Sequence, residues 1–160
     1  MASDGFTTCL WFDGRAEEAA HFYVSVFKNS ALGEVARYPE GAPQPAGGVM
    51  TVEFTANGQR FLGLNGGPQF TFNEAVSFMI FCENQEEIDH YWTKLTADGG
   101  EPGPCGWLKD RFGVSWQVVP ERLQEMITDP DPAKAARVTQ AFMAMSKFDL
   151  AALDKAYAGE

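Results

Sequence analysis

Two stretches of the sequence repeat one pattern: Glu17-Glu18-Ala19-Ala20-His21-Phe22-Tyr23 and Glu86-Glu87-Ile88-Asp89-His90-Tyr91-Trp92. Each holds two glutamates, two further residues, a histidine and two aromatic residues, and the offset between them is 69 throughout. An apolar segment precedes each stretch, at 6–12 and 76–83, and predicts a strand that leads into a helix. A repeat of this kind decides the fold before any local motif does. It indicates a duplicated strand–helix module.

Each strand–helix pair is followed by turn signals and further strands. Residues 38–48 hold three prolines and three glycines and predict a loop. Residues 49–56 and 60–65 predict the arms of a hairpin that turns at Asn57-Gly58. Residues 114–119 predict the last strand of the second half. The sequence therefore predicts an α+β fold of two βαβββ modules.

The last forty residues have a different, helical pattern. A short helix is expected after Pro120, a second begins at Asp131-Pro132, and a third begins at Asp149. Asp is a favoured N-cap and Pro a favoured first helical residue. We expect paired modules in residues 1–120, at about 5–68 and 75–120, and a helical extension at 121–160.

Charge and composition exclude several classes of partner. The chain of 160 residues carries a net charge of −10 and has no basic run, which disfavours nucleic acid and anionic membranes. No apolar stretch approaches the roughly 20 residues that span a bilayer. The three cysteines are widely spaced and form no CxxC motif, so neither a zinc knuckle nor a disulfide framework is indicated. We expect a cytoplasmic protein with reduced thiols.

Motifs spread over residues 6–120 resemble the PhnB-like branch of the vicinal oxygen chelate superfamily. That superfamily includes glyoxalase I, bleomycin-resistance proteins and extradiol dioxygenases. The motifs are Leu10-Trp11-Phe12-Asp13-Gly14, Leu64-Asn65-Gly66-Gly67-Pro68, Phe70-Thr71-Phe72-Asn73-Glu74 and Gly106-Trp107-Leu108-Lys109-Asp110-Arg111-Phe112-Gly113 with Trp116-Gln117. The resemblance implies that the two modules form a shared cavity, and it contributes to our expectation of a homodimer.

Many members of this branch carry the label 3-demethylubiquinone 3-methyltransferase, which the residues do not support. A nucleotide-like cofactor in a doubly wound fold needs a glycine-rich loop between an early strand and a helix. The one candidate, Asn65-Gly66-Gly67-Pro68, precedes no helical pattern and lacks the spacing.

The resemblance also implies where a metal ion would bind in metal-using relatives. Each module there supplies one ligand from its first strand and one from its last, and these positions correspond to Thr8, Leu62, Ser77 and Gln117. Of the four, Gln117 alone is a plausible ligand, and one neutral amide is weak. The two histidines, His21 and His90, lie on predicted helices. We therefore expect no metal site and no cofactor.

Side chains of the cavity strands would then form a small-molecule site, with apolar walls and a few hydrogen-bonding groups. The expected ligand-binding residues are Thr8, Leu10, Asn65, Ser77, Met79, Phe81, Trp107, Ser115 and Gln117. The alternative is that these side chains fill a closed core. Glu53 and Gln117 are the candidate catalytic residues, since a desolvated strand carboxylate can act as a base. Glu53 could equally face solvent.

Two main readings of function follow. The first is a metal-independent protein that binds a small apolar or aromatic compound. The second is a metal-dependent enzyme of the glyoxalase or dioxygenase type. An interaction protein, whose dimer interface is its function, is a third reading. Whether the chain catalyses a reaction stays open at this point.

Overall fold

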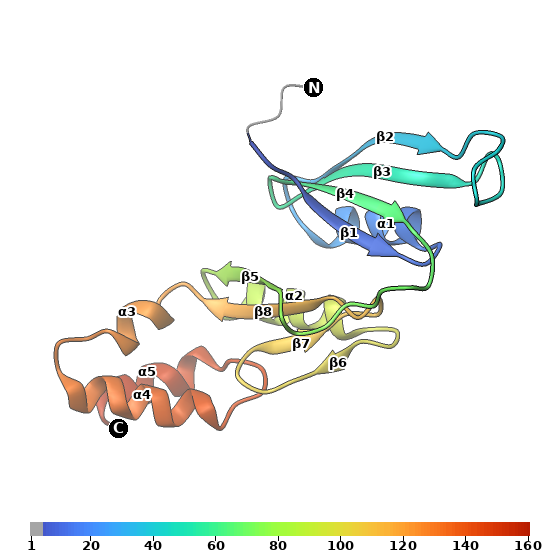
Figure 1. Cartoon of the computed structure of the whole chain (residues 1–160). Helices are drawn as coiled ribbons and strands as arrows, with labels where there is room; N and C mark the ends of the chain where they lie inside the picture. Colours follow the sequence, from blue (N-terminus) through green and yellow to red (C-terminus); the bar gives the residue numbers. More distant parts are fainter. Residues whose placement is uncertain (1–4) are drawn as a thin grey trace. The chain divides into compact units, whose positions relative to one another are not determined.

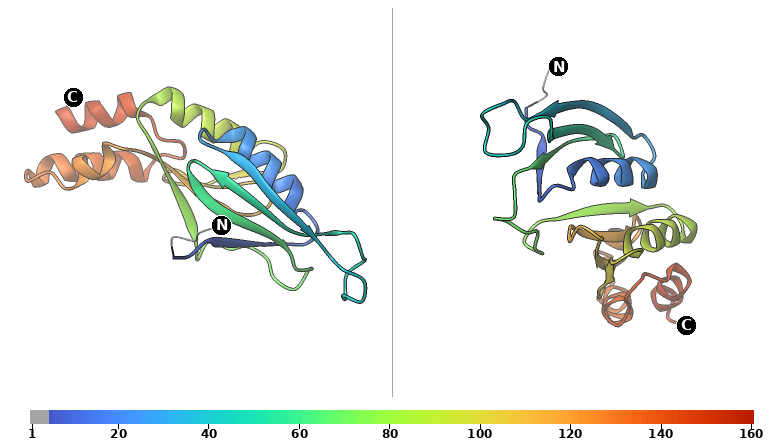
Figure 2. Two further views of the ribbon diagram at one scale, coloured as in Figure 1. Left: turned by 90° about the horizontal axis from the view of Figure 1, so that it is seen from above. Right: turned by 90° about the vertical axis from the view of Figure 1, so that its right-hand side faces the viewer.

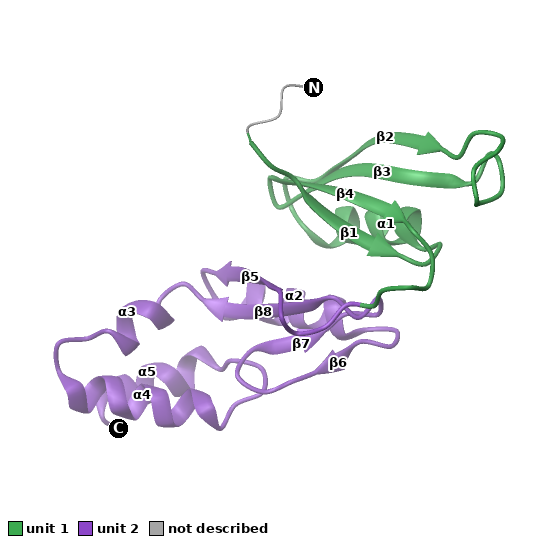
Figure 3. Cartoon of the chain, viewed as in Figure 1, with its two compact units in different colours: residues 1–71 green, residues 72–160 purple. Residues whose placement is uncertain are grey.

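The computed structural model describes residues 5–160 and divides into two compact units, residues 1–71 and 72–160 (Figure 3). The first unit contains β1 (Thr8–Phe12), α1 (Ala16–Val26), β2 (Ala31–Arg37), β3 (Val49–Ala56) and β4 (Gln59–Asn65). The second contains β5 (Ser77–Cys82), α2 (Gln85–Thr96), β6 (Glu101–Pro102), β7 (Trp107–Lys109), β8 (Ser115–Pro120), α3 (Leu123–Ile127), α4 (Pro132–Met143) and α5 (Leu150–Ala158).

The two units share one sheet topology. The strand order is β1-β4-β3-β2 in the first sheet and β5-β8-β7-β6 in the second. In each, the first and last strands pair in parallel and the remaining neighbours pair antiparallel. One helix lies along one face of each sheet (Figures 1 and 2). The predicted α+β fold of two βαβββ modules with C-terminal helices is confirmed.

α1 packs on one face of the first sheet, and α2 packs on one face of the second. We call the opposite face of each sheet its open face. On the first sheet, Tyr23 of α1 stacks on Phe54 with ring centroids 5.9 Å apart. Gly63 lies under Ala16, whose Cβ would be 3.2 Å from a Cβ added at position 63. These contacts place the core of the first unit between α1 and the sheet.

The turn between strand and helix is one residue longer in the first module than in the second. Both first strands end on a buried side chain, Phe12 in β1 and Cys82 in β5. α1 begins at Ala16, four positions after Phe12, whereas α2 begins at Gln85, three positions after Cys82. Side chains point alternately to the two faces of a strand. If the positions of β1 are assigned by counting back from α1, as for β5 and α2, the additional residue places every side chain of β1 on the wrong face.

Asp110 organises the turn that joins β7 to β8. Its side chain is 2% exposed. Oδ1 accepts hydrogen bonds from the backbone N–H of Phe112 (2.9 Å) and Val114 (3.1 Å), and Oδ2 accepts one from Trp116 Nε1 (2.8 Å). The carboxylate thereby fixes both the turn and the first residues of the last strand.

The C-terminal helices belong to the second unit, and α4 and α5 lie side by side (Figures 1 and 2). Asp131 caps α4 by accepting from Ala133 N (2.9 Å), and Asp149 caps α5 by accepting from Ala152 N (3.0 Å). Both helix starts agree with the sequence prediction. Within residues 5–160, no helix has the length and apolar character needed to cross a membrane.

We expect Asp110→Ala to lower the free energy of unfolding by about 2 kcal/mol or more, because three donors lose a charged acceptor in a buried site. Urea denaturation measures this. Asp98→Ala is the matched control, because Asp98 is an exposed partner of Arg111 in a surface ion pair worth at most about 1 kcal/mol. Equal losses in the two variants would contradict the role given to Asp110.

Candidate functional site

The open face of the second sheet brings together six of the residues that the sequence predicts to bind a ligand. The strand register pairs Ser77 with Ser115, Met79 with Gln117, and Gln117 with Trp107. Gln117 Nε2 donates a hydrogen bond to Ser77 Oγ at 2.9 Å. The six residues are Ser77, Met79, Phe81, Trp107, Ser115 and Gln117. Met79 and Phe81 are 50% and 57% exposed.

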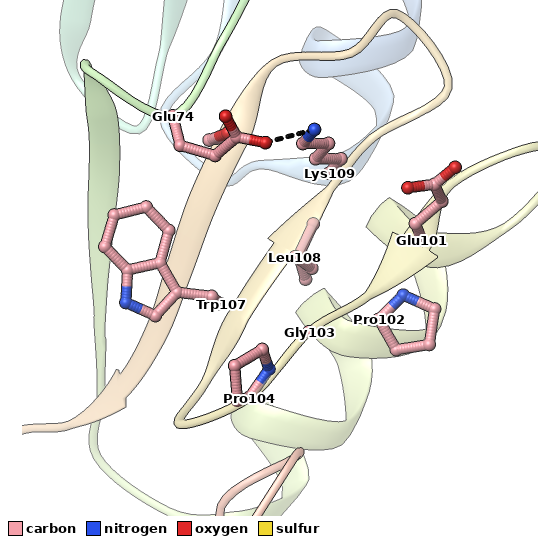
Figure 4. A pocket seen from close by; sticks show the side chains of 9 residues that line it. Glu74, Glu101, Pro102, Gly103, Pro104, Trp107, Leu108 and Lys109 are labelled. Carbon is pink, nitrogen blue, oxygen red and sulfur yellow. Dashed lines mark ion pairs between the residues drawn. The ribbon is translucent and has the colours of Figure 1, made fainter.

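A pocket of about 500 Å³ lies beside these residues, within the second unit (Figure 4). Its apolar lining comes from Trp107 and Leu108 of β7 and from Pro102 and Pro104. Its polar lining includes Glu74, Lys109 and Ser115. Apolar walls with a few polar groups are typical of small-molecule sites.

Ser115 contributes a hydrogen-bonding group to this pocket that the fold does not use. The residue is 1% exposed, and its Oγ has no hydrogen-bond partner among residues 5–160. Burying a hydroxyl without a partner costs about 1–3 kcal/mol. Ser115 thus places an unpartnered hydroxyl at the wall of the pocket.

An ion pair between Glu74 and Lys109 lies at the same pocket (Figure 4). The hydrogen bond from Lys109 holds the pKa of the Glu74 carboxyl below its ordinary value, and the same bond raises the pKa of the Lys109 amine. Above the ordinary pKa of a glutamate, both side chains are charged and the ion pair is fully formed. The ion pair is lost when Glu74 is protonated, as the pH falls through its lowered pKa.

On the first sheet, the structure corrects the positions of two predicted ligand-binding residues. Leu10 is 5% exposed and lies on the helix-facing side of β1, and Thr8 shares that side by alternation. The open face of β1 carries Cys9 and Trp11 instead, and Thr7 directly precedes the strand. The longer turn before α1 explains the one-residue error, because the expected positions were counted back from the helix.

Asn65 is engaged within the fold. Its Oδ1 accepts from the backbone N–H of Ala16 at 2.9 Å, and its Nδ2 donates to Val49 O at 3.0 Å. The residue is 9% exposed. Both ends of its amide thus hold the start of α1 and the start of β3. Asn65 also lines a pocket in the first unit, separate from the one on the second sheet, and its role in ligand binding stays a prediction.

Glu53 lies on the open face of the first sheet, in the middle of β3. Its register partner on β4 is Leu62. The side chain is partly buried, and Oε2 has no hydrogen-bond partner among residues 5–160. The sequence left open whether Glu53 faces solvent. In the structure, its Oε2 is shielded from solvent.

The positions implied for a metal ion do not fit one. Leu62 pairs with Cys9 as Gln117 pairs with Met79, so the register agrees with the correspondence between Leu62 and Gln117. With Ser77, these positions offer an aliphatic chain, one amide and one hydroxyl, whereas divalent metals in proteins need several histidine, thiolate or carboxylate donors. In the part of the chain from residue 5 onward, no group of three or more His, Cys, Asp or Glu side chains could hold a metal ion.

A segment of the C-terminal extension, residues 145–148, holds the wall of the pocket, and we call it the strap. Met145-Ser146-Lys147-Phe148-Asp149 resembles the tails of the PhnB-like branch, but the sequence prediction assigned this stretch no contact. Cys105 N donates to Met145 O and Gly106 N donates to Ser146 O, both at 2.8 Å. Ser146 Oγ donates to Gly103 O at 2.6 Å. Gly103 and its neighbour Pro104 line the pocket, so the strap fixes the loop between β6 and β7.

Phe148 and α2 anchor the strap. Phe148 is 2% exposed, and a Cβ added at Gly106 would lie 2.4 Å from its ring. Gln85 Nε2 donates to Phe148 O at 3.0 Å, and Gln85 Oε1 accepts from Leu150 N at 2.9 Å. Gly106, with φ of 80°, is the sequence signal for this close approach, but nothing near it in sequence points to Phe148.

Comparison with known proteins gives a consistent family. The family model described as 3-demethylubiquinone-9 3-methyltransferase matches residues 4–119. The chain is 38% identical to the PhnB protein of Bacillus cereus over 73% of this chain and 99% of that one, with a TM-score of 0.65. No curated protein matches the chain.

More distant structures share the fold. A Pseudomonas aeruginosa protein is 20% identical, with a TM-score of 0.59 over 74% of this chain and 98% of that one. The fosfomycin resistance protein FosX of Listeria monocytogenes, in complex with Mn(II) and sulfate, is 18% identical, with a TM-score of 0.51 over 74% and 92%. The family match ends before α3, so the strap lies outside it.

We expect Phe148→Ala to speed hydrogen exchange at the amides of Cys105 and Gly106 by about 100-fold or more. Truncating a buried phenylalanine costs about 3–5 kcal/mol of packing energy. Because Phe148 anchors the strap, this loss makes local opening of the strap more frequent and exposes the two amides. Exchange followed by NMR measures each amide separately. Tyr157→Phe, which removes the 2.5 Å hydrogen bond to Asp129 within the extension, is the control and should leave both amides protected. Unchanged exchange at Cys105 and Gly106 in Phe148→Ala would refute the strap.

We expect the Glu74 carboxyl to titrate below an ordinary glutamate and to return upward in Lys109→Met, because the donor that lowers its pKa is removed. Carboxyl ¹³C shifts followed against pH measure the midpoint. Lys94→Met, on α2, is the matched control. A midpoint that is the same in both variants would show that Lys109 does not set it.

Proposed function

The chain belongs to the 3-demethylubiquinone-9 3-methyltransferase family, within the PhnB-like branch of the vicinal oxygen chelate superfamily, and from this we propose that it binds a small apolar or aromatic compound without a metal ion. The proposed site is the pocket on the second sheet, with Trp107 as its aromatic wall. The observation that carries the proposal is the buried Ser115 hydroxyl, which lines this pocket and has no partner among residues 5–160.

The pocket's chemistry supports a compound with a flat apolar body and one polar group. Trp107, Pro102 and Pro104 offer apolar surface against which a ring can pack. Ser115 Oγ can donate to, or accept from, a carbonyl or hydroxyl of the compound. A volume of about 500 Å³ lies in the range of small-molecule sites.

Two other activities have weaker support. Methyl transfer, which the family's name mentions, would need a glycine-rich loop for a nucleotide-like cofactor, and the turns before α1 and α2 read Asp13-Gly14-Arg15 and Glu83-Asn84. A glyoxalase- or dioxygenase-like reaction at a metal ion would need ligands where Leu62, Ser77 and Gln117 stand. Catalysis by Gln117 or Glu53 therefore forms no part of the proposal.

The expected homodimer stays part of the proposal. β5 is an edge strand of its sheet. Met79 and Phe81 on this strand are at least half exposed, and so is Val76, which directly precedes it. An apolar edge strand of this kind is usually covered in a native assembly.

We expect at least one of indole, 1-naphthol and 1,4-naphthoquinone to raise the melting temperature of the metal-stripped chain, because a compound that binds the native state stabilises it by mass action. Zn²⁺, Ni²⁺, Mn²⁺, Fe²⁺ or Mg²⁺ added alone should cause no shift. Trp107→Ala should remove the shift that the compound causes, whereas Phe70→Ala, which truncates a 64% exposed phenylalanine outside the pocket, should keep it.

Ser115→Ala separates binding from folding. It removes a buried hydroxyl that lacks a partner, so the stability of the free chain should stay the same or rise. The shift caused by 1-naphthol or 1,4-naphthoquinone should fall, because the polar contact is lost. A clear shift with one metal ion, lost in Gln117→Ala, would overturn the proposal in favour of a metalloenzyme.

A further inference from the structure

The first unit has a pocket of its own, of about 410 Å³, beside Glu53. Its lining includes Thr7, Gly33, Glu53, Arg60 and Leu62. No residue lines both this pocket and the pocket on the second sheet. An inference about it is therefore independent of the function proposed above.

Glu53 gives this pocket an unsatisfied acceptor. Its Oε2 is buried and has no hydrogen-bond partner among residues 5–160. A buried carboxylate oxygen without a donor is costly, and native structures contain few such atoms without a functional or structural reason. Its neighbour across the sheet is Leu62, whose aliphatic side chain has no group to donate.

A β-bulge in β2 makes room beside this carboxylate. Leu32 pairs with Phe54 and Val35 pairs with Val52, so two residues of β2, Gly33 and Glu34, lie opposite the single residue Glu53. Bulges of this kind redirect side chains and are frequent next to active sites. Here the extra residue belongs to the strand at the edge of the sheet.

The glycine in the bulge is required by its closeness to Glu53. A Cβ added at Gly33 would lie 3.0 Å from both the Cβ and the carbonyl oxygen of Glu53. Any other residue would press against the base of the Glu53 side chain. The glycine therefore allows β2 to lie close against Glu53 at the bulge, and both residues line the pocket.

We propose that this pocket binds a small organic cation, with a protonated amine donating to the Glu53 carboxylate and an apolar body against Leu62 and Leu32. A charged donor makes the stronger hydrogen bond to a carboxylate, roughly twice that of a neutral donor. The chain's net charge of −10 also favours the approach of cations over anions. The edge of Leu32, 44% exposed, gives the apolar body a surface to cover.

Three probes with one apolar body and different polar groups test the proposal: benzylamine, benzyl alcohol and benzoate. Amide NMR shifts of the ¹⁵N-labelled chain report both affinity and location. We expect benzylamine to bind most tightly, benzyl alcohol about tenfold more weakly, and benzoate least, with shifts at Gly33, Glu53 and Leu62. No benzylamine binding at these residues, or equal binding of benzoate, would overturn the proposal.

Variants of the bulge assign the effect to Glu53. Glu53→Gln keeps the shape and should weaken benzylamine by about tenfold or more while leaving benzyl alcohol nearly unchanged. Glu34→Gln removes the same charge from the neighbouring, exposed bulge residue and should change neither probe by more than about twofold. Gly33→Val should block both probes.

Equal loss of benzylamine binding in Glu53→Gln and Glu34→Gln would show a general charge effect and overturn the site. Shifts confined to Trp107 and Ser115 would assign the amine to the other pocket and also overturn it.

Discussion

The parallel pairing of the first and last strands of each module is the constraint on which the rest of the structure depends. Parallel neighbours cannot be joined by a hairpin, so the chain must cross over through a helix before the last strand returns. This puts α1 and α2 each on one face of its own sheet, and the other face carries no crossover helix of the same module. It also sets Gln117 beside Ser77, forty positions apart, where their side chains form a hydrogen bond of 2.9 Å.

The sequence predicted the modules because period and turn chemistry are local. The Asn57-Gly58 turn and the Asp caps of α4 and α5 each read directly from neighbouring residues. The apolar residues on both faces of 76–83 also predicted a strand, but the expectation that this strand is central and covered on both sides was wrong, because β5 lies at the edge of its sheet with Met79 and Phe81 exposed. The faces of β1 could not be read in the same way. They depend on which side chains the core buries, and one additional residue in the turn before α1 reverses the result of counting from the helix. The same count was correct for β5, where Ser77, Met79 and Phe81 do lie on the open face.

The contacts of the strap could not be predicted from the sequence, for a different physical reason. Its hydrogen bonds to the pocket loop use backbone groups of Cys105, Gly106 and Met145, and backbone groups have no residue-specific signature. The side chains that support it, Gln85 and Phe148, are separated by 63 positions and belong to a helix and an irregular segment. Helix propensity and capping predict the helices of the extension, but tertiary contacts of this kind follow only from the folded chain.

The open faces of the two sheets hold opposite chemistry at corresponding positions. Leu62 corresponds to Gln117, and their register partners are Glu53 and Trp107. On the first sheet the last strand is therefore apolar and its neighbour acidic, whereas on the second the last strand is polar and its neighbour aromatic. Each face also carries one buried oxygen without a partner among residues 5–160, a carboxylate at Glu53 and a hydroxyl at Ser115. Each of these atoms lowers the stability of the free chain, because a buried polar group without a partner loses its bonds to water. Their presence on the open faces therefore fits the two ligands of different chemistry proposed for the two pockets.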